Sequence, residues 1–122
     1  MTDEALARAF GPYLRGLREA KQASDKGYSL RKVAEKVGVA PGTLSRIEQG
    51  DLLPGEGLVF KLAGVLDEDP DVMLAAAGRV ARDLQEIICK RPKVFGEMLR
   101  QLRNAPDHAI LKVVRVVRDG KW

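Results

Sequence analysis

One short polar stretch offers the clearest chemistry in this sequence of 122 residues. In AEKVGVAPGTLSRIEQG, Leu44 and Ile47 are apolar at a helical spacing, which leaves the other side of the segment free. The residues on that free side are Pro41, Gly42, Thr43, Ser45, Arg46 and Gln49. An arginine can donate two parallel hydrogen bonds to the O6 and N7 atoms of a guanine. The stretch therefore predicts a helix edge that can bind a base in a DNA groove.

Two short predicted helices, 30–37 and 41–49, must position this edge. Ser29 can cap the first helix, Gly38 tolerates the positive φ that ends it, and Pro41 suits the first position of the second. Ala34 is small enough to let the two helices cross closely. Two short helices joined by a glycine turn are the helix-turn-helix pattern, whose second helix enters the major groove.

The segment SLRKVAEKVGVAPGTLSRIEQG strongly resembles the Cro/phage-repressor type of helix-turn-helix, the XRE-like group of bacterial and phage regulators. The likeness continues through GLVFKLAGVLDEDPDVML and covers roughly residues 10–78. It implies an all-α, five-helix domain whose third helix, about 41–49, enters the major groove of DNA.

The resemblance also implies a role for each matching position. The base-reading positions are Pro41, Gly42, Thr43 and Arg46. The phosphate-contacting positions are Ser29, Arg31, Lys32, Ser45 and Gln49. The structural positions are Ala34, Gly38, Glu48 and its expected ion-pair partner Arg18. Plainer alternatives stay open: Arg46 as a solvated surface residue, Thr43 as support for the helix start, and Pro41 and Gly42 as helix-initiating residues.

Three departures from the family pattern concern the phosphate contacts. Leu30 replaces a common glutamine, and Ala40 replaces the usual serine or threonine cap. The loop DLLPGEG is acidic where relatives often carry basic residues. We therefore expect fewer phosphate contacts than typical, and either modest affinity or compensation from elsewhere in the chain.

The charge pattern is consistent with a polyanionic partner. Ten Lys and Arg balance ten Asp and Glu in residues 1–68, whereas eleven basic residues face seven acidic ones in 69–122. From Arg15 to Arg46, eight basic residues outnumber three acidic ones, which predicts a local basic patch. The composition is that of a globular chain, and MTDEALARAF does not resemble a signal peptide. We expect a cytoplasmic protein that associates with the nucleoid through DNA.

The tail, residues 79–122, has more apolar surface than the front domain needs. Two apolar stripes at helical spacing precede the segment 106–120. The ends of that segment favour a helix and its valines favour a strand, and we prefer a helix. We expect this tail to be a dimerisation element, with packing on the front domain as the alternative. Cys89 is expected to be a buried hydrophobe rather than a redox thiol, and His108 a surface or capping residue.

These observations predict an all-α protein with a DNA-binding domain, 1–78, and a mainly helical extension, 79–122. The predicted function is a sequence-specific homodimeric repressor that binds double-stranded DNA. The alternative is an antitoxin-like or adaptor module whose tail binds a partner protein. The sequence shows no nucleophile–base pair, metal-ligand cluster or phosphate-binding loop, so neither catalysis nor a cofactor nor a metal is predicted.

Overall fold

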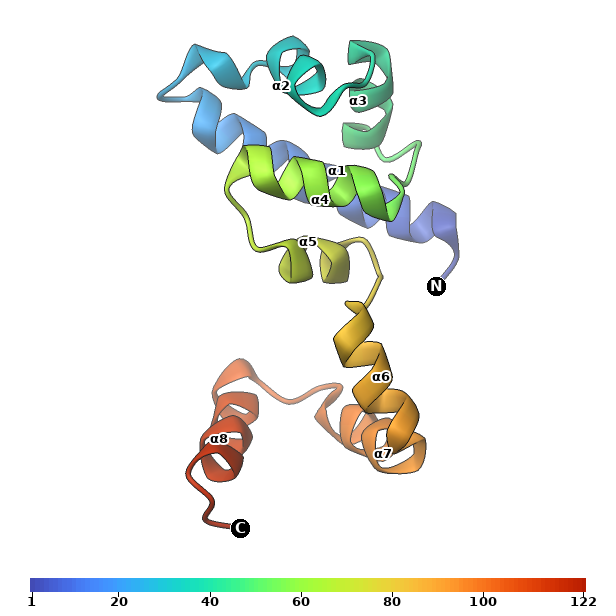
Figure 1. The fold of residues 1–122 in the computed structure, drawn as a ribbon, viewed down its shortest axis with the longest axis vertical. Helices are drawn as coiled ribbons and strands as arrows, with labels where there is room; N and C mark the ends of the chain where they lie inside the picture. Colours follow the sequence, from blue (N-terminus) through green and yellow to red (C-terminus); the bar gives the residue numbers. More distant parts are fainter. The chain divides into compact units, whose positions relative to one another are not determined.

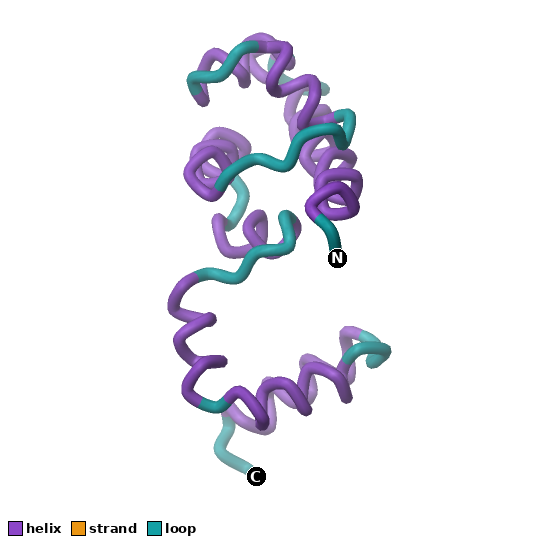
Figure 2. Tube along the Cα trace, turned by 90° about the vertical axis from the view of Figure 1, so that its right-hand side faces the viewer, coloured by secondary structure: helices purple, strands orange, loops and turns teal.

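The computed structural model describes residues 1–122, which form eight α-helices and no strand (Figure 2). The all-α prediction is therefore confirmed, and the ambiguous segment 106–120 is a helix. The chain divides into two compact units, Met1–Ala81 and Arg82–Trp122 (Figure 1). We refer to them as unit 1 and unit 2.

Unit 1 holds five helices around one core. They are α1 (Asp3–Gln22), α2 (Leu30–Val37), α3 (Pro41–Glu48), α4 (Glu56–Leu66) and α5 (Pro70–Ala76). In Figure 1, α2 and α3 lie on one side of α1 and α4, and α5 lies on the other. The largest fully buried side chains come from all five helices: Phe10, Leu14, Val33, Leu44, Ile47, Val59, Leu62, Leu66, Met73 and Leu74.

Local sequence signals set the ends of these helices. The Ser29 hydroxyl accepts a hydrogen bond from the Lys32 N–H at 3.3 Å and caps α2, as predicted. Gly38, at φ 77°, ends α2 in the left-handed conformation that glycine tolerates best. The Asp69 carboxylate accepts from the Asp71 N–H at 2.8 Å and caps α5. Helix α4 begins at Glu56, whose carboxylate favours the first turn.

Unit 1 extends past the end of α5 to Ala81. Gly78, at φ 76°, turns the chain, and the Arg79 N–H donates to the Leu74 carbonyl at 2.8 Å. The Arg79 guanidinium then donates through Nη1 to the Pro54 carbonyl. Ala81 is only 8% exposed and belongs to the core. These contacts attach the loop between α3 and α4 to the end of α5.

Unit 2 holds α6 (Arg82–Lys90), α7 (Pro92–Leu102) and α8 (Asp107–Arg118), and none of its residues is buried. Eleven of its large apolar side chains are 38–86% exposed: Leu84, Ile87, Val94, Met98, Leu99, Leu111, Val113, Val114, Val116, Val117 and Trp122. Cys89 is exposed too, so the prediction of a buried Cys89 was wrong. The apolar stripe that includes it has no core of its own to enter.

No helix in the chain combines the length and the apolar character that crossing a membrane requires.

Candidate nucleic-acid interface

The inner faces of α2 and α3 are fully committed to the core. Val33, Ala34, Leu44 and Ile47 are 0% exposed, and Val37 is 3% exposed. Ala34 presents only a methyl group, which lets α2 and α3 lie close together. Burial of one whole side of α3 fixes which of its side chains can reach a ligand.

The outer side of α3 carries most of the predicted DNA-contacting residues. Pro41, Gly42 and Arg46 are exposed, and Thr43 is half-buried. Arg46 lies in the last turn of α3 and forms no ion pair within the chain. Its five N–H donors are therefore available to a ligand.

Ser45 and Gln49, both predicted phosphate contacts, form a hydrogen-bonded pair. The Gln49 Nε2 donates to the Ser45 Oγ at 3.0 Å across one turn. Because this hydroxyl already accepts, its own proton stays free to be donated. The pair lines a small hollow together with Leu30 and Arg15. Arg15 was not among the residues predicted to contact phosphates. Arg15 also pairs with Glu19 at 3.0 Å.

The start of α2 lies beside the start of α3. Arg31 and Lys32 are exposed in the first turn of α2 and line a shallow hollow together with Val39, Pro41 and one carboxylate, that of Glu35. The N-terminus of a helix favours anions, and these two cations add to that preference. Arg31 and Lys32, which are predicted to contact phosphates, therefore lie beside the N-terminal end of α3, where the predicted base-reading residues begin.

A buried ion pair holds α3 against α1. The Arg18 Nε donates to Glu48 Oε2 at 2.6 Å, and Nη2 donates to Oε1 at 2.9 Å. Nη1 donates to the Gln22 side chain at 2.9 Å and to the Tyr28 carbonyl at 3.2 Å. The hydrogen bonds that Arg18 donates to the Glu48 carboxylate raise the pKa of Arg18 above its usual value. This expected pair is structural, because its two side chains are only 7% and 4% exposed.

Gly11 is the positioning residue that sequence analysis missed. A Cβ at Gly11 would lie 2.6 Å from the Glu48 carbonyl oxygen, 2.7 Å from that of Ile47 and 2.8 Å from the Gly50 nitrogen. The backbone of α1 and the end of α3 therefore meet with no room for a side chain. A glycine on the apolar side of a long amphipathic helix was the available signal, since a glycine inside a helix costs about 1 kcal/mol relative to alanine.

The basic patch between Arg15 and Arg46 is smaller than its composition suggests. Arg18 is buried against Glu48, and Arg15 pairs with Glu19. The Lys36 Nζ donates to the Gly27 carbonyl at 3.1 Å and lies 4.5 Å from the centre of the Tyr28 ring. The Lys21 Nζ lies 5.5 Å from the centre of the same Tyr28 ring. The cations without such partners are Lys26, Arg31, Lys32 and Arg46.

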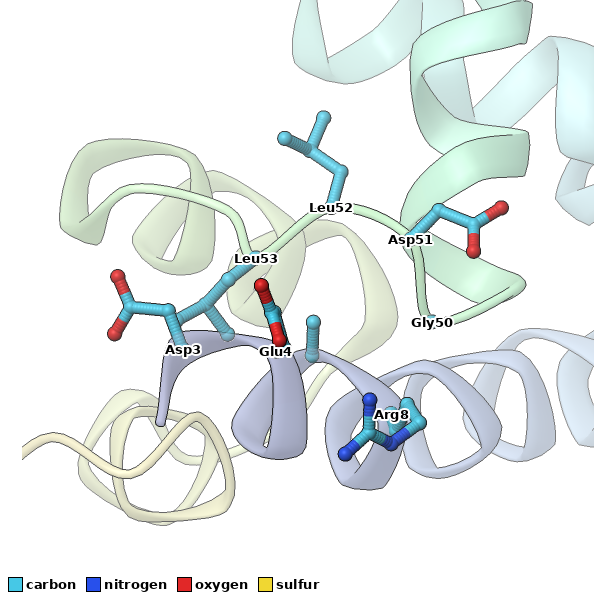
Figure 3. Close-up of a pocket in the computed structure, with 8 residues that line it drawn as sticks. Asp3, Glu4, Arg8, Gly50, Asp51, Leu52 and Leu53 are labelled. Carbon is cyan, nitrogen blue, oxygen red and sulfur yellow. The ribbon is translucent and has the colours of Figure 1, made fainter. Parts of the chain in front are cut away.

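Acidic side chains surround the far end of the interface. Figure 3 shows a pocket between the first turns of α1 and the loop that follows α3. Asp3, Glu4 and Asp51 line it, and Arg8 is the only cation among its lining residues. Carboxylates at this position repel phosphates, so this end of unit 1 adds little attraction for DNA.

Comparison with known proteins agrees with this geometry. A family model described as Helix-turn-helix matches residues 17–73, which include α2, α3, the loop after them and α4. No curated protein matches the chain. Residues 17–73 thus form a helix-turn-helix domain of the Cro/phage-repressor type, a domain found in DNA-binding regulators.

Proposed function

We propose that the protein is a sequence-specific transcriptional repressor that binds operator half-sites as a homodimer, with α3 in the major groove. The observation that carries the proposal is the outer side of α3, where Arg46 is exposed and unpaired while the inner side is fully buried. In a helix-turn-helix protein this side of the second helix faces the base edges. Arg31 and Lys32 then lie at the start of α2, where phosphates bind.

Substitution of Arg46 tests base reading directly. We expect Arg46→Ala to lose about 1–3 kcal/mol of discrimination at one base pair, measured by selection from random duplexes followed by competition binding. Arg46→Lys is the matched control for charge: it keeps the cation but loses the planar fork, so its discrimination should also fall while its salt dependence stays unchanged. An unaltered preference in both variants would contradict the proposal.

The exposed apolar surface of unit 2 supports the homodimer. Its eleven large apolar side chains are 38–86% exposed within the chain, although a monomeric protein rarely leaves a large apolar surface uncovered. On α8, Val113 and Val117 lie on the side of the helix opposite Arg115, whereas Val114 lies one turn from Arg118. Two copies can therefore cover these valines while Arg115 faces solvent, and a two-fold dimer matches two half-sites about 34 Å apart.

A charged residue in the valine face tests the dimer. We expect Val114→Asp to convert the dimer to a monomer in sedimentation experiments over a range of concentrations, and to weaken binding to a two-half-site operator more than to a single half-site. Val72→Asp is the matched control, since Val72 is similarly exposed, at 49% against 51%, but lies on α5 of unit 1. A native chain that is monomeric at all concentrations would contradict the homodimer, and a tail that captures a different protein instead would favour the adaptor function.

A further inference from the structure

The two units differ in net charge. Unit 1, which contains the helix-turn-helix, has eleven basic and twelve acidic residues and a net charge of −1. Unit 2 has ten basic and five acidic residues and a net charge of +5. The whole excess of positive charge therefore lies outside the domain that is expected to bind the bases.

Several cations of unit 1 are also held in contacts within the unit. Arg18 and Arg15 are paired with carboxylates, Lys21 and Lys36 lie over Tyr28, and Arg79 binds the Pro54 carbonyl. Of the acidic side chains in Figure 3, Asp51 lies beside the end of α3, and Asp3 and Glu4 lie on the first turn of α1. Because DNA binding depends strongly on phosphate neutralisation, unit 1 alone provides an unusually small electrostatic contribution.

Helix α8 presents the best-organised cations of unit 2. Lys112, Arg115 and Arg118 recur every three residues, so they follow one row of the helix surface. With a rise of about 1.5 Å per residue, the row extends over roughly 9 Å, long enough to face two or three successive phosphates of one strand. All three are exposed; Lys112 and Arg115 form no ion pair, and Arg118 pairs with its neighbour Asp119 at 3.2 Å.

We propose that this basic row of α8 (Lys112, Arg115 and Arg118) binds the phosphate backbone of the duplex outside the base pairs contacted by α3. The proposal rests on the proposed function, because α3 must first bring the tail to DNA. Once unit 1 is bound, the tethered row is held at a high effective concentration near the flanking phosphates. Two of its members are arginines, whose guanidinium can bind a phosphate through two hydrogen bonds. The basic row thus adds phosphate contacts to the few that unit 1 is expected to make.

The experiment measures the salt dependence of binding by the full-length chain to a random-sequence duplex. Each lost phosphate contact should reduce the slope of log K against log [salt] by about 0.9. We expect Arg115→Gln to reduce it by about that amount per chain, and the triple variant Lys112→Gln, Arg115→Gln, Arg118→Gln to reduce it by about 2 to 3. Lys61→Gln is the charge-matched control, since Lys61 is exposed on α4 and lies in neither candidate surface, and it should leave the slope unchanged.

Two further measurements separate the possible failures. Sedimentation must show the same mass for the native chain and the triple variant, so that a change of slope is not a change of assembly. If the triple variant leaves the slope unchanged while Arg46→Ala still loses sequence preference, the proposal for the basic row is overturned and the proposed function stands. If the triple variant then also fails to bind phosphatidylglycerol vesicles that the native chain binds, the basic row is assigned to a membrane surface. A native chain that binds no duplex at low salt overturns both.

Discussion

The two units of this chain are built on opposite principles. Unit 1 buries side chains from all five of its helices and has almost no net charge. Unit 2 buries none of its residues, exposes eleven large apolar side chains and contains the whole charge excess. A domain with its own core can hold α3 in a fixed geometry, whereas helices without a core need a partner to cover them. The comparison suggests that unit 1 supplies sequence recognition and unit 2 supplies association.

The largest effect that sharpens this comparison is expected from separating the units. A fragment comprising residues 1–81 should unfold cooperatively at a midpoint that is independent of its concentration, because its core is internal. A fragment comprising residues 82–122 should lose helical circular dichroism on dilution, because isolated short helices are marginal in water. Stable helix in the second fragment at the lowest measurable concentration would show that unit 2 is self-sufficient.

Equivalent truncations in the two units should differ several-fold in cost. Phe10 is 0% exposed in unit 1, and Phe10→Ala should lower the free energy of unfolding by about 3–5 kcal/mol. Leu111 is 54% exposed in unit 2, and Leu111→Ala should change it by less than about 0.5 kcal/mol in the 1–122 monomer. Denaturant titration of both variants at low concentration provides the measurement. Equal costs would remove the distinction between the units.

Two glycines of α1 provide a matched pair within unit 1. A Cβ at Gly11 would meet three backbone atoms of the α3 end within 2.8 Å, whereas a Cβ at Gly16 meets nothing within 4 Å. Gly11→Ala should therefore destabilise unit 1 by about 1–3 kcal/mol, since overpacked backbone must move. Gly16→Ala should stabilise it by about 0.5–1 kcal/mol through helix propensity. A stabilised Gly11→Ala variant would contradict the close contact between α1 and α3.

The smallest predicted effect concerns alkaline pH and is confined to unit 1. Burial and the neighbouring Glu68 carboxylate, which accepts from the Tyr13 hydroxyl at 3.3 Å, raise the pKa of Tyr13 to about 12. The unfolded chain loses this proton near pH 10, so the stability contributed by the neutral hydroxyl should decline as the pH rises from about 10 to 12.

The variant Tyr13→Phe should remove that part of the alkaline decline, as measured by chemical denaturation at each pH. Tyr28→Phe is the control, because it removes the other tyrosine and leaves the Tyr13–Glu68 contact in place. If the two variants follow the same pH profile, Tyr13 has no special environment.

Local signals predicted most of the fold of unit 1. Ser29, Gly38, Pro41 and Asp69 act through their own backbone or nearest neighbours, so the ends of their helices could be inferred from residue type alone. The family resemblance added the Arg18–Glu48 pair, which joins residues thirty positions apart and has no local signature. Roles of the outer α3 residues remain predictions, because they concern a ligand rather than the chain.

Features that depend on tertiary contacts were beyond sequence reasoning. The exposure of Cys89 could not be inferred, because an apolar stripe predicts burial only where a core exists to receive it. The contacts of Lys21 and Lys36 with Tyr28 could not be inferred either, because the spacing of charges does not show them. Gly11 was overlooked because its neighbours in α3 lie more than thirty residues away along the chain.

The close approach at Gly11 has a consequence for how such a regulator can change its target. With no side chain between the two backbones, α3 cannot slide or tilt along α1 without losing the contact. Under the proposed function, a new target would then require exchange of the outward side chains of α3 rather than a shift of α3 against α1. Grafting a different set at positions 42, 43 and 46 should thus redirect the protein to another sequence while its scaffold stays unaltered.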